Sequence, residues 1–195
     1  MTVFQLPQIH HPACLGMLAF LGVVLFVPAG PELAAAESIV QYRVNGLFQP
    51  DRQDALTTAA QALEGCHLTG VDYDTALASF AYDPDHQLFK NAKPEQVLQR
   101  INDQIRRLTN GCFTLSLPGK LPPEKLVEIR FEIEGLDCLG CSFGAYRAVA
   151  GIDGVERATA SFHEGRLTAW IDPAKTNREA LAAALTKKEI TILHP

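Results

Sequence analysis

The chain has 195 residues, 47% of them hydrophobic and 20% charged, a globular composition that is long enough for one ordinary domain or two small ones. Its formal net charge of -5 excludes the strongly basic surface that tracks phosphates, so no nucleic-acid partner is expected. Composition alone does not choose between one domain and two.

Residues 1–36 form a candidate export signal. They contain an apolar run over residues 15–27, which is shorter than the roughly 20 residues that span a bilayer. Ala34 and Ala36 supply small residues at positions -3 and -1 before Glu37, as signal peptidase requires. We therefore expect a cleaved signal peptide and a periplasmic or secreted protein. The alternative is an uncleaved segment that anchors the protein in a membrane and faces it outward.

Six elements are predicted in the part of the chain that follows. A strand, a helix, two strands, a helix and a strand are expected at residues 40–44, 51–63, 68–73, 77–82, 94–108 and 113–117. The longer helix carries an apolar stripe, and Arg106 and Arg107 in its last turn oppose the helix dipole. Gly111 is placed to end it.

A second series of elements follows in the same order. Apolar and charged residues alternate over residues 127–133, which predicts a strand, and an apolar stripe then predicts a helix that ends at Gly151 or Gly154. A hairpin turns at residues 163–165, and its inner face is expected to hold Ala158, Ala160, Phe162, Leu167, Ala169 and Ile171. Asn177 is placed to cap a helix over residues 178–185, and residues 190–193 are predicted to close the sheet as a fourth strand.

The two series are related by a constant offset of 89 residues. Gly46-Leu47 recurs as Gly135-Leu136, and Gly65 recurs as Gly154. Asp83-Pro84 likewise recurs as Asp172-Pro173, which indicates two copies of one unit. Each copy has the order βαββαβ, so the predicted fold class is α+β, with two tandem ferredoxin-like domains in which two helices cover one face of a four-stranded antiparallel sheet.

Cys138 and Cys141 stand three positions apart, between the first strand and the first helix of the second copy. Thiolates are soft donors that suit Cu(I), Hg(II), Zn(II) or Cd(II), and a helix N-terminus favours the anion. Two ligands from one short loop leave an ion open on its outer side, whereas a closed four-thiolate site holds its ion for structure. The pair therefore indicates a carrier, chaperone or scavenger of a thiophilic metal ion.

The second copy resembles the heavy-metal-associated (HMA) domain, a family that includes copper chaperones, modules of P-type ATPases and a periplasmic mercury-binding protein. The resemblance rests on residues 135–138 with Cys141, on Gly154-Val155 after the helix, and on Asp172-Pro173. It implies that Cys138 and Cys141 are the metal ligands. It also implies that a membrane metal transporter donates or accepts the ion.

The same resemblance divides the chain into domains. Residues 126–195 are expected to form the metal-binding domain and residues 37–117 a degenerate HMA-like domain. In the first copy Gln49 and Arg52 stand where the cysteines would be, and an amide and a guanidinium cannot replace thiolates. Residues 118–125, rich in proline, are expected to be a linker.

Several residues near the cysteines have two interpretations. Asp137 is either a third, auxiliary ligand or a capping acceptor for loop and helix amides. His163 is a further candidate ligand, although a histidine in a hairpin turn is more often only solvated. Lys187 or Lys188 would offset the charge of a metal held by two thiolates, and the alternative is an ordinary cation at a helix C-terminus.

Cys66 and His67 are expected to be structural residues, and no disulfide is expected between Cys66 and Cys112. Cys66 and His67 are adjacent at the start of a strand, where neighbours point to opposite faces, so they are not expected to form a second site. Cys66 and Cys112 belong to opposite ends of the predicted sheet, about 17–20 Å apart. A disulfide needs Cα atoms within about 7 Å, so none is expected between them.

Three functions follow from these patterns. The leading hypothesis is an exported soft-metal-binding protein that is not an enzyme. A thiol-disulfide oxidoreductase also presents a CxxC at a helix start, but its fold would need another strand order and a proline opposite the site. The third hypothesis is a pair of protein-interaction modules in which the cysteines are oxidised and idle.

Overall fold

The computed structural model describes residues 37–193, which belong to one compact unit. The predicted export signal of residues 1–36 lies outside the described residues. No helix in the described part of the chain is long and apolar enough to cross a membrane.

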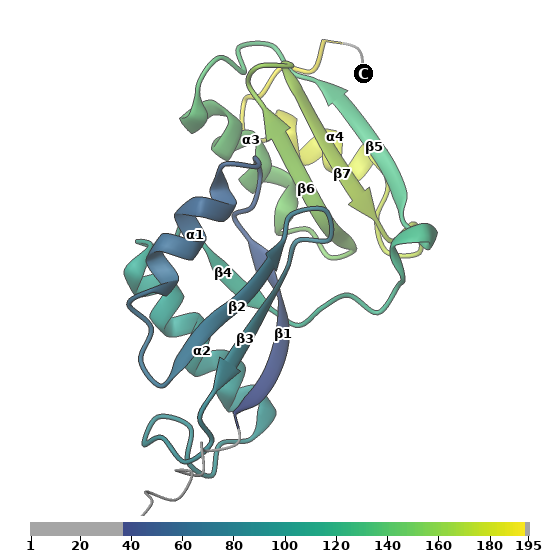
Figure 1. The fold of residues 1–195 in the computed structure, drawn as a ribbon. Coiled ribbons are helices and arrows are strands. Elements are labelled where there is room, and N and C mark those ends of the chain that lie inside the picture. Colours follow the sequence, from purple (N-terminus) through teal and green to yellow (C-terminus); the bar gives the residue numbers. More distant parts are fainter. Residues whose placement is uncertain (1–36, 194–195) are drawn as a thin grey trace, which may run out of the picture. The chain divides into compact units, whose positions relative to one another are not determined.

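The first half folds around an antiparallel four-stranded sheet, here called sheet A. Its strands are β1 (Ser38–Asn45), β2 (Cys66–Asp72), β3 (Leu77–Tyr82) and β4 (Thr114–Ser116), in the spatial order β2-β3-β1-β4. Two helices, α1 (Arg52–Ala60) and α2 (Pro94–Leu108), lie on one face of this sheet (Figure 1). The element order and the antiparallel four-stranded sheet are those predicted for a ferredoxin-like unit.

The second half repeats this arrangement around sheet B. Its strands are β5 (Val127–Glu132), β6 (Val155–Ser161) and β7 (Arg166–Ile171), in the order β5-β7-β6. The helices α3 (Leu139–Ala150) and α4 (Arg178–Thr186) cover one face (Figure 1). A 3-10 turn, η1 (Pro123–Lys125), precedes β5 in the predicted linker.

The two halves form the same turns at positions that are 89 residues apart in the sequence. Gly46 and Gly135 both have positive φ, and so do Gly65 and Gly154. The amide of Asp83 donates to the carbonyl of Gly65, and the amide of Asp172 donates to that of Gly154 in the same way. Because equivalent residues form equivalent turns, the offset of 89 residues describes a structural repeat.

The predicted closing strand at residues 190–193 is wrong. This segment forms a single bridge, Ile192 with Ile133, one residue beyond the end of β5, so the described part of sheet B has three strands. Two hydrogen bonds flank the bridge, from Glu134 N to Thr191 O and from Leu193 N to Glu132 O. The ladder is short because β5 already ends at Glu132, where the chain turns into the cysteine loop.

The predicted inner face of the β6–β7 hairpin is confirmed except at Phe162. The other five residues are buried, but β6 ends at Ser161, one residue before the aromatic ring. Phe162 therefore follows the turn instead of the strand alternation, and its ring packs on that of His163 with 4.0 Å between centroids.

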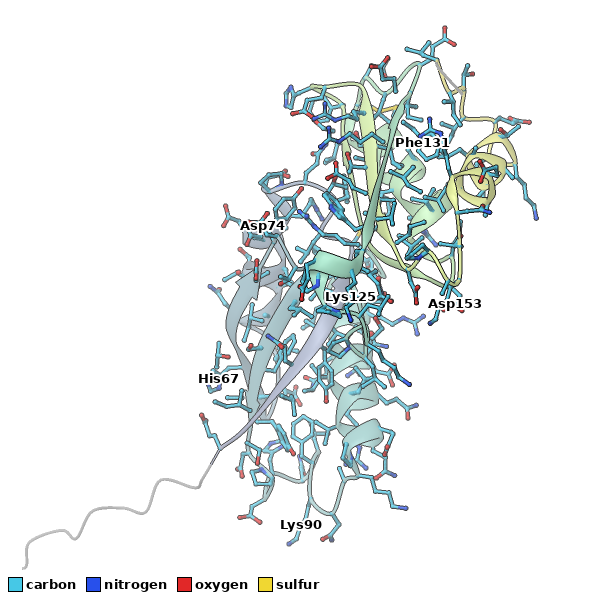
Figure 2. The ribbon with its side chains drawn as sticks, turned by 90° about the vertical axis from the view of Figure 1, so that its right-hand side faces the viewer. His67, Asp74, Lys90, Lys125, Phe131 and Asp153 are labelled. Carbon is cyan, nitrogen blue, oxygen red and sulfur yellow. A yellow bond between two sulfur atoms is a disulfide. The ribbon has the colours of Figure 1, made fainter. Side chains whose placement is uncertain are left out.

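The two halves contact each other through charged and aromatic side chains. Nη1 of Arg43, on β1, donates to Oε2 of Glu156, on β6, at 2.8 Å. Arg157 lies over the ring of Tyr73 at 5.0 Å and within 3.6 Å of a carboxylate oxygen of Asp74. Figure 2 labels Asp74, which lies in the turn that joins β2 and β3.

Each sheet packs its own hydrophobic core against its helices. The core of the first half contains Phe80, Leu56 and Ile101, which are completely buried. The core of the second half contains Phe131, labelled in Figure 2, and also Phe48 from the first half. One aromatic side chain therefore belongs by sequence to the first repeat and by packing to the second.

Candidate metal centre

The cysteine loop joins the end of β5 to the start of α3. Gly135 takes a φ of 70°, a left-handed conformation that favours glycine, and so turns the chain out of the strand. Leu136 is buried in the core of the second half, beneath the loop. Between this turn and the helix, Asp137 and Cys138 are exposed.

Cys138 is the N-cap residue of α3. Its Sγ accepts a hydrogen bond from the backbone N–H of Cys141 at 3.0 Å. A sulfur therefore takes the place that a serine or aspartate oxygen usually fills at a helix start. The positive end of the helix dipole is directed at the same atom, which favours negative charge on it.

The two cysteines are joined by a disulfide, with their Cα atoms 5.1 Å apart. Cys138 is exposed and Cys141 is half-buried. The bond is thus accessible to a thiol or to a reductant in solution. Reduced to thiols, the same two sulfur atoms become donors for a soft ion.

Asp137 lies beside the sulfurs and does not cap the helix. Its Oδ1 is 3.3 Å from Sγ of Cys141, and one ligand atom from each of Asp137, Cys138 and Cys141 lies within 4.8 Å of the others. The capping interpretation is wrong because Cys138, one residue later, receives the amide hydrogen bond. Cys138 immediately precedes the helix, so its sulfur is the side-chain acceptor at the N-cap position, and it accepts from the amide of Cys141.

A cavity of about 390 Å³ is lined by Cys141 and by residues of the turn after α4. Lys188 and Glu189 line this cavity, and so do Leu136 and Gly144. Lys187 ends α4 as its C-cap, so Lys188 is the one of the two predicted lysines that shares the cavity with Cys141.

His163 is exposed in the β6–β7 turn and stacks on Phe162. It is not part of the cluster of Asp137, Cys138 and Cys141, which is the set of candidate metal ligands found among the described residues. The structure therefore does not bring this histidine together with the sulfurs.

Ser142, directly after Cys141, was not singled out from the sequence. Its side chain is completely buried, and its hydroxyl has no hydrogen-bond partner within the described part of the chain. Ser142 stands three positions before Ala145 and seven before Val149, and this helical spacing could have indicated that residue 142 faces the core.

The corresponding loop of the first repeat has a different use. Gln49, at the position of the first cysteine, is 7% exposed, and its side-chain amide donates to the carbonyl of Ala160 at 2.9 Å. The guanidinium of Arg52 lies over the rings of Phe48 and Phe113, at 5.7 and 5.2 Å from their centroids. This loop, residues 46–52, is called the docking loop below.

Cys66, His67 and Cys112 are not part of the ligand cluster of Asp137, Cys138 and Cys141 found among the described residues. Cys66 is a buried free thiol, and burial raises its pKa from 9.0 to about 11. His67, its neighbour, lies on the outside of β2 (Figure 2), 3.8 Å from Glu37. Cys112 is an exposed free thiol in the connection between α2 and β4.

The fold and the loop together define an exposed dithiol or disulfide at a helix N-terminus on an α+β scaffold. No protein-family model matches the chain, and comparison with curated proteins finds no match.

Among solved structures, oxidized MerP from Ralstonia metallidurans CH34 is 18% identical and covers 35% of this chain and 99% of its own, with a TM-score of 0.33. The CopZ metallochaperone is 21% identical and covers 34% of this chain and 100% of its own, with a TM-score of 0.33. The water-soluble region of the P-type ATPase CopA from Bacillus subtilis is 17% identical. It covers 82% of this chain and 92% of its own, with a TM-score of 0.32.

Proposed function

We propose that this protein binds a thiophilic metal ion through Cys138 and Cys141 once their disulfide is reduced. One observation carries the proposal: two cysteine sulfurs lie together on an exposed loop, at a helix N-terminus whose amide already points at one of them. Binding without a closed ligand shell suits a carrier, chaperone or scavenger, because a partner's ligands reach the ion from solvent.

The metal is proposed to be Cu(I), Hg(II), Zn(II) or Cd(II), which all accept thiolate ligands. Asp137 supports the harder ions of this group, since its carboxylate is the third ligand atom of the cluster. If Asp137 is a ligand, Asp137→Asn weakens Zn(II) binding by about tenfold and leaves Cu(I) binding nearly unchanged. Equal losses for both ions would remove Asp137 from the ligand set.

The test is a metal titration of the reduced protein, with elemental analysis of the eluted fraction. We expect one ion per chain in the wild type and none in Cys138→Ser/Cys141→Ser. Cys112→Ser is the matched control because Cys112 is also an exposed cysteine but lies in the other repeat. Loss of binding in the control variant, or retention in the double variant, would contradict the proposal.

The disulfide itself favours a second candidate function, that of a thiol-disulfide oxidoreductase. In that reaction a substrate dithiol loses two electrons and two protons, the substrate disulfide forms, and the Cys138–Cys141 bond is reduced to two thiols. Catalysed oxidation of a model dithiol, with oxidised glutathione as the terminal oxidant that re-forms the Cys138–Cys141 bond, and its loss in Cys138→Ser would support this candidate over metal binding. We propose a binding protein and not an enzyme, since an open pair of soft donors needs no further groups.

We also propose that the protein is exported and exchanges its ion with a membrane metal transporter. Residues 34–37 support export, because they offer signal peptidase a site after Ala36. N-terminal sequencing of the protein from the periplasm or medium should give a chain that begins at Glu37. An uncleaved chain in the membrane fraction would instead indicate an anchor that faces outward.

A further inference from the structure

The docking loop of the first repeat is built into the second repeat. Phe48 is 3% exposed and belongs to the same hydrophobic cluster as Phe131 and Leu181 of the second repeat. Cys141 is partly buried against that same cluster. A side chain more than 90 positions earlier in the sequence therefore shares a core with one of the two reactive sulfurs.

One backbone hydrogen bond and one side-chain hydrogen bond hold the docking loop on sheet B. The amide of Ala160 donates to the carbonyl of Phe48 at 3.0 Å, and Gln49 Nε2 donates to the carbonyl of Ala160 at 2.9 Å. Strand β6 is an edge strand, so these groups of Ala160 point away from the sheet's own ladder. Phe48 and Gln49 satisfy both and fix the loop in register with the strand.

From this position Phe48 packs on α3, the helix that begins at the cysteines. Its ring centroid lies 5.3 Å from that of Phe143 and 5.6 Å from that of Tyr146. These two residues are three positions apart, so they share one face of the helix. Phe143 is only two residues beyond Cys141.

A buried hydrogen bond ties the same helix face to the turn before Phe48. The amide of Gly46 donates to the hydroxyl of Tyr146 at 2.7 Å. Gly46 has a φ of 112°, and a Cβ there would come within 2.4 Å of the carbonyl oxygen of Cys112. The turn is therefore held from both repeats, and it places a fixed donor opposite Tyr146.

Helix α3 is thus packed on two sides. Ser142, Ala145 and Val149 face the core of sheet B, while Phe143 and Tyr146 meet the docking loop. The first turn of the helix carries Cys141, whose amide donates to the sulfur of Cys138. A shift of this turn therefore changes the distance between the sulfurs and the direction of that N–H group.

We propose that Phe48 and Gln49 are positioning residues for the Cys138–Cys141 pair, and that the degenerate loop of the first repeat serves to fix the helix that carries it. Packing that holds both sulfurs close together makes the disulfide form more readily and lowers the ordering cost of binding an ion. The metal part of this inference rests on the proposed function, whereas the disulfide part does not.

The test compares Phe48→Ala with Phe48→Leu and with Val97→Ala in the intact chain. Val97 is buried on α2 in the core of the first half and is not part of the cluster around Phe48, so its truncation loosens the first repeat without uncovering α3. The first measurement, made without metal, is the equilibrium with dithiothreitol, whose two thiols pass two electrons and two protons to the disulfide and close into a ring. The second measurement is the Kd of the reduced chain for Cd(II).

For Phe48→Ala we expect an equilibrium constant shifted about fivefold toward the dithiol and Cd(II) binding weakened about tenfold. Phe48→Leu keeps apolar bulk against Phe143 and should restore both values to within about twofold of wild type. Val97→Ala should also stay within that range, because it only destabilises the first repeat.

Equal disulfide equilibria in Phe48→Ala and Val97→Ala would overturn the proposal. If circular dichroism shows that Phe48→Ala is unfolded, Gln49→Ala takes its place, because it removes only the amide that donates to Ala160. A wild-type chain that binds no Cd(II) would contradict the proposed metal function. The positioning role would still be decided by the equilibrium measured without metal.

Discussion

Ser142 shows how closely the cysteine loop adjoins the hydrophobic core of the second half. Its hydroxyl is buried without a partner in the described structure, which costs about 1–3 kcal/mol relative to a hydrogen-bonded hydroxyl. We predict that Ser142→Ala raises the free energy of unfolding by about 1 kcal/mol, measured in urea. Ser116→Ala is the matched control: Ser116 Oγ accepts from Nε of Arg43 at 3.1 Å, so its loss should lower stability by a similar amount. A destabilised Ser142→Ala would show that the hydroxyl has a partner in solution.

Cys66 should make stability depend on pH only in the alkaline range. Burial raises the pKa of its thiol from 9.0 to about 11, so between these values the unfolded chain releases a proton that the folded chain retains. The contribution of Cys66 to the free energy of unfolding is therefore fully present below about pH 9. It is lost as the pH rises toward 11. The wild-type curve should drop more steeply than that of Cys66→Ala over this range, as measured by urea unfolding at each pH. Parallel curves would contradict the burial effect.

At the scale of single elements, a turn contributes most to stability where both the available space and the backbone φ angle exclude a side chain. Gly46 has a left-handed φ, and a Cβ added there would lie 2.4 Å from a backbone oxygen, whereas one added at Gly70 on edge strand β2 would have nothing within 4 Å. We predict that Gly46→Ala lowers the free energy of unfolding by more than about 2 kcal/mol. Gly70→Ala should leave it unchanged or raise it by about 0.5 kcal/mol. Similar thermal unfolding of the two variants would argue against this geometry.

The helix that carries the cysteines is also understood best as an element. Its cap is a sulfur, and the aromatic ring of Phe48, from another part of the chain, packs on its outer face. Alternation and helical spacing predicted β5 and α3 well, because each has one buried face. The cap was assigned to Asp137 as one alternative, because carboxylates are common N-caps and the exact first residue of a helix depends on the loop before it.

For the molecule as a whole, the contacts between the repeats should make unfolding cooperative. Trp170, the single tryptophan, lies on β7 and stacks under Arg157 at 4.1 Å, next to the contact with Tyr73. We predict that Trp170 fluorescence and far-ultraviolet circular dichroism report the same urea midpoint. Phe48→Ala, which removes the central aromatic contact, should separate the two midpoints. Separate transitions already in the wild type would show that the repeats unfold independently.

Much of this architecture could be predicted from local patterns. The offset of 89 residues paired Gly46 with Gly135 and Gly65 with Gly154, and all four take the positive φ that their turns require. The strands and helices follow alternation and helical spacing, and the helix predicted over residues 94–108 has those bounds. These features are local, because burial of one face within a strand or helix leaves its period in the sequence.

Only the tertiary structure decided which surfaces meet. The missing fourth strand of sheet B depends on where β5 ends relative to residues 190–193, and no periodicity encodes that meeting point. The placement of Phe48 and Gln49 on β6 and α3 joins residues about 100 positions apart, through an aromatic contact and two hydrogen bonds. Sequence by itself therefore determined the repeat and the cysteine pair, since both are local patterns. Packing between distant segments determined how the first repeat contacts α3, the helix that begins at that pair.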